Sequence, residues 1–247
     1  VDAKYIIVHG GDILNKYDQE RYFTYVSKVK SGKPLQYITN KQEFMGENFY
    51  VDENVLIPQP DTEILVENTI KLVQTTFKKL TEIKILDLCT GSGAIAVSIK
   101  KYLNLLNVNS KIYASDISKS ALKIAKKNAK NILKDDNAID FIESNMFENI
   151  KEKFDIIVSN PPYIKSSAIS TLPKDVQNEP NIALNGGEDG LDFYRIINEN
   201  VNEYLNKNAY LLMEIGYDQG NVVKSMFDNS ILLKDYSGND RIVVLKK

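Results

Sequence analysis

The chain has 247 residues, enough for one large α/β domain or for one domain with a small appendage. Its 43% hydrophobic and 26% charged residues are typical of a soluble globular protein, and its net charge of −2 argues against a large nonspecific electrostatic grip on nucleic acid. One cysteine (Cys89) excludes an intramolecular disulfide, and one histidine (His9) argues against a histidine triad or a multi-histidine metal site. No apolar stretch approaches transmembrane length, so we expect a cytoplasmic protein without a membrane partner. Because there is only one histidine, we also expect no metal.

The N-terminal part predicts a helix, a hairpin and a stiff connector. Residues 18–31 carry apolar side chains at helical spacing, and Gly32-Lys33-Pro34 ends that helix. Residues 43–51 predict a β-hairpin, and Ile57-Pro58-Gln59-Pro60 is a stiff connector. Asp61 or Thr62 is then expected to cap a helix that continues to about Lys79.

From residue 84 onward, predicted strands and helices alternate. Apolar runs predict strands at 84–88, 111–115, 139–143, 154–159 and 209–215, and helical spacing predicts helices at 94–102, 119–133, 191–205 and 221–228. Residues 231–234 and 242–245 are expected to form an antiparallel pair at the end. The alternation predicts an α/β fold with a doubly wound parallel sheet, which binds ligands at the carboxyl ends of its strands.

The motif Asn160-Pro161-Pro162-Tyr163 directly follows the predicted strand at 154–159. Neither proline has an N–H to donate, so the strand must stop at Asn160 and open into a rigid turn. The turn offers the amide of Asn160, the carbonyl of Pro161 and the aromatic face of Tyr163. These groups suit a planar substrate with an NH2 group, such as an amide or an exocyclic base amine. The alternative is an ordinary proline-rich loop.

A glycine-containing loop, Asp87-Leu88-Cys89-Thr90-Gly91-Ser92-Gly93-Ala94, joins the strand at 84–88 to the next helix. Gly91 and Gly93 permit a tight turn and close approach of a ligand to the backbone. The spacing continues as Gly-x-Gly-x-x-Ala, so binding of a dinucleotide such as NAD has to be considered.

Two further strand ends complete the candidate cofactor site. Asp116 can accept hydrogen bonds from a ribose diol, and it can also cap the helix that begins near Lys119. In Asn145-Met146-Phe147, the last two side chains could cover an adenine while Asn145 bonds its edge; core packing is an equal alternative for Met146. No histidine or lysine is placed for the proton relay of a dehydrogenase, so the Asn-Pro-Pro-Tyr turn favours methyl transfer over hydride transfer.

These three motifs resemble those of class I S-adenosylmethionine-dependent methyltransferases, and Asn-Pro-Pro-Tyr is shared by enzymes that methylate glutamine amides or adenine N6. Further segments resemble the HemK-type release factor glutamine N5-methyltransferases over nearly the whole chain. They are Gly32-Lys33-Pro34-Leu35-Gln36-Tyr37-Ile38, Leu56-Ile57-Pro58-Gln59-Pro60-Asp61-Thr62-Glu63, Glu179-Pro180 with Ala183-Leu184, Gly187-Glu188-Asp189-Gly190-Leu191, Glu214-Ile215-Gly216 and Asp235-Tyr236-Ser237-Gly238-Asn239-Asp240-Arg241.

The resemblance implies a small N-terminal helical domain for substrate recognition (1–38), a β-hairpin linker (39–60) and a Rossmann-like seven-stranded methyltransferase domain (61–247). It implies S-adenosylmethionine as cofactor, S-adenosylhomocysteine as product and the glutamine of the Gly-Gly-Gln loop of peptide chain release factors as substrate. Carried over by position, the cofactor contacts are Cys89, Thr90, Gly91, Ser92 and Gly93 (methionine part), Asp116 (ribose), Met146 (adenine) and Asn160, and the glutamine contacts are Asn160, Pro161, Pro162 and Tyr163.

Three features depart from the family pattern. Gln59 stands where arginine is usual, and Asn145 stands where an acidic residue is common. The chain begins at Val1-Asp2-Ala3, which predicts a truncated N-terminal domain.

The predicted catalytic residues are Asn160, Pro161 and Tyr163. The Asn160 oxygen and the Pro161 carbonyl would accept the two N–H groups of the substrate amide and stabilise positive charge developing on its nitrogen, while Tyr163 packs on the amide. The alternatives are an adenine N6 methyltransferase, which would need a sizeable basic target-recognition region, and a non-catalytic adapter for ribosomal or release factors. We expect a monomer without a stable nucleic-acid partner.

Overall fold

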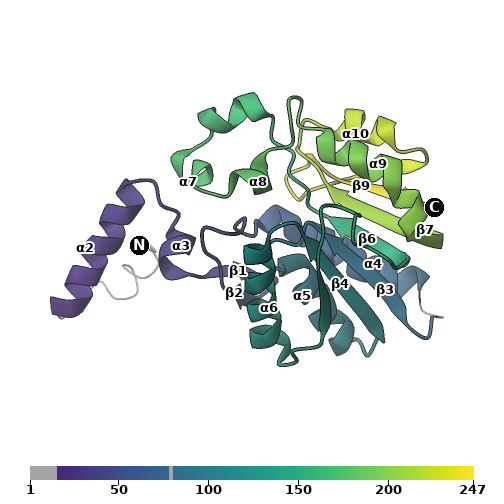
Figure 1. Ribbon diagram of the computed structural model, residues 1–247, viewed down its shortest axis with the longest axis horizontal. Coiled ribbons are helices and arrows are strands. Elements are labelled where there is room, and N and C mark those ends of the chain that lie inside the picture. The colour runs from purple at the N-terminus through teal and green to yellow at the C-terminus, as the bar shows by residue number, and fades with distance from the viewer. Residues whose placement is uncertain (1–15, 78–79) are drawn as a thin grey trace.

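The computed structural model describes residues 16–77 and 80–247, and a mixed sheet forms the centre of this part (Figure 1). Its seven strands run in the order β5-β4-β3-β6-β7-β9-β8. In chain order they are β3 (Ile83–Leu88), β4 (Ser110–Asp116), β5 (Ile139–Glu143), β6 (Phe154–Ser159), β7 (Leu205–Glu214), β8 (Ser230–Lys234) and β9 (Asp240–Lys246). The α/β fold and the seven-stranded Rossmann-like sheet predicted from the sequence are confirmed.

The predicted parallel strands and the expected antiparallel pair belong to one mixed sheet. Strands β5, β4, β3, β6 and β7 are parallel to one another, but β9 is antiparallel to both β7 and β8. The expected antiparallel pair is therefore present, with β9 inserted between β7 and β8 and joined to the main sheet. A hairpin pattern at the end of the chain fixes only the pairing of these two strands with each other, not their place in the sheet.

Helices cover both faces of the sheet, because alternate residues of each strand point to opposite sides. On one face, Ile83 and Ile85 of β3 pack with the helices α4 (Pro60–Thr76), α5 (Ala94–Leu105) and α6 (Lys119–Leu133). On the other, Leu86 and Leu88 pack with α9 (Asp192–Tyr204) and α10 (Gly220–Met226). These two apolar layers hold the strand ends in a fixed arrangement.

The expected cap of α4 is wrong. Gln59 occupies the N-cap position without a capping side-chain bond, and Pro60 is the first helical residue. Proline suits that position because its missing N–H would have no helical partner there. Asp61 and Thr62 consequently lie inside the first turn, and the Thr62 side chain is buried.

The hairpin before α4 consists of β1 (Gln42–Phe44) and β2 (Glu47–Phe49), as predicted. It packs directly on the sheet domain, because Phe44 and Phe49 belong to the same apolar layer as α4 and α5. Asn128 of α6 also donates to the carbonyl oxygens of Tyr50 (3.0 Å) and Ser92 (2.9 Å). The linker is thus held against the glycine-containing loop.

The remaining elements are the N-terminal helices and an insertion between β6 and α9. Before it come α2 (Lys16–Lys30), which buries no residue and projects away from the sheet in Figure 1, and α3 (Leu35–Thr39). Between β6 and α9, where the sequence predicted no element, the chain forms η1 (Ser166–Thr171), α7 (Lys174–Gln177) and α8 (Asn181–Leu184). Asn178 donates to the Gly32 carbonyl oxygen at 3.1 Å, so this insertion contacts the N-terminal segment. The predicted site residues all lie in the described part, whereas His9 and Lys79 lie outside it.

Candidate functional site

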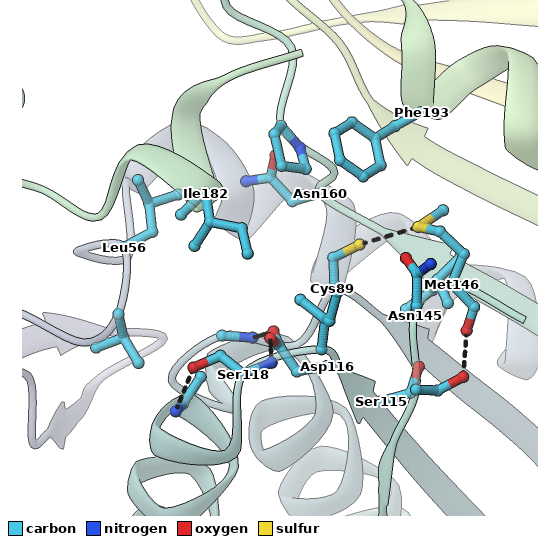
Figure 2. Close-up of a pocket in the computed structure, with 18 of the residues that line it drawn as sticks. Leu56, Cys89, Ser115, Asp116, Ser118, Asn145, Met146, Asn160, Ile182 and Phe193 are labelled. Carbon is cyan, nitrogen blue, oxygen red and sulfur yellow. Dashed lines mark hydrogen bonds between the residues drawn. The ribbon is translucent and has the colours of Figure 1, made fainter. Parts of the chain in front are cut away.

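A cavity of about 210 Å³ opens where β3, β4 and β6 end (Figure 2). Asp116 and Asn160 lie on opposite sides of it, and Cys89 lies between them. Apolar side chains not assigned to the site from the sequence complete its wall: Leu56 of the linker, Ile182 of α8 and Phe193 of α9. The topology therefore brings the predicted loops together at one edge, as expected for parallel strands.

The glycine-containing loop needs unusual backbone conformations at three positions. The φ angles of Cys89, Gly91 and Gly93 are 65°, 53° and 80°. At Gly93 an added Cβ would lie 3.0 Å from the Ala125 Cβ and 3.1 Å from the Ala125 Cα, so α6 leaves no room for a side chain. The positive φ values agree with the expected tight turn, and the glycine at position 93 also allows α6 to pack against the loop, which the sequence did not predict.

Asp87, near the end of β3, forms hydrogen bonds that connect this loop to the start of α5. Its Oδ2 accepts hydrogen bonds from the Thr90 hydroxyl (2.5 Å) and from the Ala96 N–H (3.1 Å) in the first turn of α5. Burial raises the pKa of Asp87 to about 7, although both hydrogen bonds oppose the rise. The sequence included Asp87 in the loop but gave no sign of this supporting role.

Asp116 faces the cavity and also organises the loops around it. Its Oδ2 accepts from the Gly91 N–H and its Oδ1 from the Ser118 N–H, both at 2.8 Å. Burial raises the pKa of this carboxyl, and the backbone N–H groups of Ser118, Gly91 and Ile117 oppose the rise. Each oxygen keeps a further acceptor position, which suits a ribose diol.

The alternative role of Asp116 as a cap of α6 is wrong. Ser118 is the N-cap residue, and its Oγ accepts from the Ala121 N–H at 3.1 Å. Asp116 lies two residues earlier, at the end of β4, and lines the cavity.

Met146 and Cys89 meet on one wall of the cavity, with 3.8 Å between their sulfur atoms. Met146 is 7% exposed and has a φ of 48°, and its carbonyl accepts from the Ser144 hydroxyl at 2.7 Å. It therefore packs in the core and borders the cavity at the same time, so the two alternatives for it are compatible. Asn145 lines the cavity too, but its amide donates to Glu148 at 2.8 Å.

The Asn-Pro-Pro-Tyr turn closes the opposite side. The Asn160 Nδ2 donates to the hydroxyl of Thr62 in α4 at 3.2 Å, which commits the nitrogen end of the amide and leaves the oxygen end to accept. Asn160 and Pro162 line the cavity. Thr62 was expected as a helix cap and as part of a family segment, and neither expectation predicts a contact across 98 positions.

Tyr163 points away from this cavity wall, toward Glu214 at the end of β7. The Tyr163 hydroxyl donates to Glu214 Oε1 at 3.4 Å, and the Glu214 carboxyl is 2% exposed. Burial raises the pKa of Glu214 to about 7, while Thr62, Arg241 and Tyr163 oppose the rise. Glu214 was noted in the sequence only as part of a family segment.

A second, smaller cavity of about 50 Å³ adjoins the first. Both are bordered by Leu56, Cys89, Gly91 and Asn160, and the smaller one is also bordered by Gln59 and Thr62. These four residues thus lie at the boundary between the two cavities, and Asn160 is the one among them with a side-chain amide.

The predicted site residues fall into three groups by position. The larger cavity is lined by Cys89, Gly91, Asp116, Met146, Asn160 and Pro162. Thr90 and Ser92 line only the smaller cavity, and Gly93, Pro161 and Tyr163 line neither. No cluster of acidic, cysteine or histidine side chains suitable for a metal occurs among residues 16–77 and 80–247. Over the same residues no helix has the length and apolar character to cross a membrane.

Comparisons with known proteins agree with this geometry. Residues 64–179 match the family model described as "Methyltransferase small domain". The chain resembles the solved structure of a methyltransferase from Pyrococcus furiosus, with a TM-score of 0.58 and 15% identity over 94% of this chain and 99% of that one. It also resembles the SAM-dependent methyltransferase from Agrobacterium tumefaciens, with a TM-score of 0.54 and 13% identity over 83% and 69% of the two chains. At these identities the likeness concerns the fold.

Curated relatives are closer in sequence. The release factor glutamine methyltransferase of Clostridium acetobutylicum is 39% identical over 98% of this chain and 85% of its own length. Those of Aquifex aeolicus and Clostridium botulinum are 37% and 38% identical, over 92% and 100% of this chain and 80% and 87% of theirs. The family predicted from the motifs is confirmed: this chain belongs to the release factor glutamine methyltransferase family.

Proposed function

We propose that the protein transfers a methyl group from S-adenosylmethionine to the side-chain amide nitrogen (N5) of the glutamine in the Gly-Gly-Gln loop of a peptide chain release factor. The names of its relatives support the reaction class and the protein substrate. The placement of Asn160 carries the argument, because this amide lies at the boundary of two cavities and offers an acceptor oxygen there.

The larger cavity fits S-adenosylmethionine by the chemistry of its walls. Asp116 can accept from the ribose hydroxyls, Met146 and Leu56 offer apolar contacts for the adenine, and the loop from Cys89 to Gly91 can hold the methionine part. When bound, the cofactor supplies an electrophilic methyl group attached to sulfur. Burial and the charges of Asp116 and Asp87 raise the pKa of the Cys89 thiol, so this side chain stays neutral and does not compete as a nucleophile.

The chain's own residues have to position a weak nucleophile, because the lone pair of an amide nitrogen is delocalised. The Asn160 oxygen and the Pro161 carbonyl accept the two N–H groups of the substrate amide, which fixes its plane. As positive charge develops on the nitrogen, the same acceptors stabilise it. In this proposal the Pro161 carbonyl contacts the substrate amide directly, whereas Tyr163, whose hydroxyl donates to Glu214, supports the turn.

The test is methyl transfer from labelled S-adenosylmethionine to separate pools of release factor, DNA and ribosomal protein. Label should enter the release factor and should be absent from a release factor whose Gly-Gly-Gln glutamine is replaced by alanine. Label in DNA would instead favour adenine N6 methylation, and no label with no cofactor binding would favour an adapter.

Asn160→Ala provides the matching perturbation of the protein. Losing one preorganised acceptor should lower kcat by about 10²–10³-fold, with thermal stability little changed. A stable Asn160→Ala protein with near-normal single-turnover rates would contradict the mechanism.

Three further expectations belong to this proposal. They are that the N-terminal helices contribute to recognition of the release factor, that the enzyme acts as a monomer in the cytoplasm, and that it forms no stable complex with nucleic acid. Size-exclusion chromatography with light scattering, alone and with release factor or nucleic acid added, tests the second and third.

A further inference from the structure

Glu214 is a buried carboxyl group that the proposed mechanism does not use. It is the last residue of β7, and the parallel register pairs Ser159 with Met213, so Glu214 lies beside Asn160 at the carboxyl edge. Its Oε1 accepts from the Tyr163 hydroxyl at 3.4 Å, and its Oε2 has no hydrogen-bond partner in the described part of the chain. A carboxyl buried with an open acceptor position needs a reason.

Thr62 provides the connection between this carboxyl and the reacting end of the site. The Thr62 hydroxyl accepts from Asn160 Nδ2 at 3.2 Å, and Thr62 is 4% exposed. A hydroxyl that accepts in this way still has one proton to donate, and the open Oε2 of Glu214 is an acceptor for it; donation from Thr62 opposes the rise in the pKa of Glu214. The order of groups is therefore carboxylate, hydroxyl, amide, with the amide oxygen of Asn160 left for the substrate.

We propose that Glu214 is a positioning residue for methyl transfer: as a carboxylate it accepts from the hydroxyls of Thr62 and Tyr163 and so fixes the orientation of the Asn160 amide. The inference rests on the proposed function, because it assigns to Glu214 a role in presenting the Asn160 oxygen to the substrate amide. Glu214 touches neither substrate nor cofactor and acts only through these two hydroxyls.

Several charged and titratable groups face Glu214 from the packed elements. They are Asp61 of α4, Tyr163 of the turn, Tyr194 of α9, whose hydroxyl donates to the Glu214 main-chain carbonyl at 3.1 Å, and Arg241 of β9. Burial and Asp61 raise its pKa to about 7, against the effects of Thr62, Arg241 and Tyr163. When protonated, Glu214 loses acceptor capacity and gains a proton to donate, so the hydroxyl of Thr62 is no longer held as a donor.

The positioning role therefore predicts a pH dependence. The group is ionised above its pKa, so kcat should fall as the pH drops through about 7. Asp87 and Glu179 have pKa values raised to about 7 as well, which makes substitution necessary to assign the effect.

The experiment measures single-turnover methylation of a release factor between about pH 6 and 8 for wild type, Glu214→Gln and a matched control, Glu179→Gln. Glu179 is also buried, but its carboxyl accepts from the Ile57 N–H at 2.8 Å, remote from Asn160 in the hydrogen-bond network. Glu214→Gln should lower kcat roughly tenfold to hundredfold and flatten the acid limb, with the affinity for S-adenosylhomocysteine unchanged. Glu179→Gln should keep the acid limb.

A second variant tests the connection without altering the carboxyl. Thr62→Val should lower kcat in the same way, and the double variant Thr62→Val/Glu214→Gln should be no slower than the slower single variant. A Glu214→Gln protein with wild-type kcat and an intact acid limb would overturn the proposal, as would a Thr62→Val protein with unchanged kcat. Failure of the wild-type protein to methylate the release factor would instead overturn the proposed function itself.

Discussion

Replacing Asp116 by alanine tests whether this carboxylate binds the cofactor ribose. In the structure Asp116 uses one acceptor position on each oxygen for the N–H groups of Gly91 and Ser118, both at 2.8 Å, and faces the cavity with the rest. Removing a charged acceptor of two ribose hydroxyls should cost about 1.5–3 kcal/mol of binding free energy. This corresponds to a dissociation constant about 10–150-fold higher.

Folding should change less than binding in this variant. The pKa of Asp116 is raised, so the cost of burying its charge exceeds the stabilisation of that charge by the N–H groups of Ser118, Gly91 and Ile117. Removing the carboxylate loses its hydrogen bonds to the loops but also removes the desolvation cost of the buried charge. The two effects partly cancel, so the melting temperature should fall by only a few degrees.

Calorimetric titration with S-adenosylhomocysteine, together with a melting curve, measures both effects. Asp140→Ala is a suitable control, because Asp140 is an exposed aspartate on the neighbouring strand β5 that pairs with Lys111. This control should bind with wild-type affinity. If Asp116→Ala folded normally and also bound with wild-type affinity, Asp116 would have no place in the cofactor site.

Three further substitutions separate backbone and charge effects. Gly93→Ala should destabilise the protein and weaken S-adenosylhomocysteine binding, because the new Cβ meets the Ala125 backbone at 3.1 Å in addition to the strain of a positive φ, about 1–2 kcal/mol. Gly46→Ala, at a φ of 72° with open space around it, should show the strain alone in urea denaturation; equal effects at both positions would contradict the packing argument. Glu214→Gln should be more stable than wild type above pH 7. The pKa of Glu214 is raised from 4.5 to about 7 in the folded state, so the wild-type protein loses about 3 kcal/mol of unfolding free energy as the pH rises through this range. The difference should vanish below about pH 5 in denaturation experiments across pH, and a constant difference would show that ionisation is not its cause.

The sequence predicted the ligand-bearing edge of the sheet because its signals are local. Apolar runs mark β3, β4 and β6, and the residue types that end them, glycine, aspartate and Asn-Pro-Pro, determine where each strand must stop. In a parallel sheet the ends of such strands converge at one edge. Knowing the strand ends was therefore enough to predict that Cys89, Asp116 and Asn160 share a cavity.

What the sequence could not predict depends on contacts between distant segments. Thr62 lies in a helical turn that reads locally as a cap, yet its hydroxyl bonds Asn160 because α4 packs against the sheet beside β6. The wall residues Ile182 and Phe193 come from α8 and α9, and only for Phe193, which packs against the buried layer under α9, does tertiary packing set the place at the cavity. Local pattern carries no information about which of many apolar residues borders a ligand.

The two carboxyls at the ends of β3 and β7 have a common physical character. Asp87 and Glu214 are both buried, both have pKa values raised to about 7, and each has one oxygen without a hydrogen-bond partner among the described residues. Each such group opposes folding once it is ionised, since a buried charge loses its hydration. Each also accepts a hydrogen bond from a hydroxyl of a loop that follows a strand, from Thr90 for Asp87 and from Tyr163 for Glu214. A buried acceptor is rigid and excluded from water, so it can hold a turn in one conformation where a solvated group would not. In the proposed mechanism, the same burial that lowers stability near neutral pH allows Glu214 to hold the Asn-Pro-Pro-Tyr turn, as Asp87 holds the glycine-containing loop at Thr90.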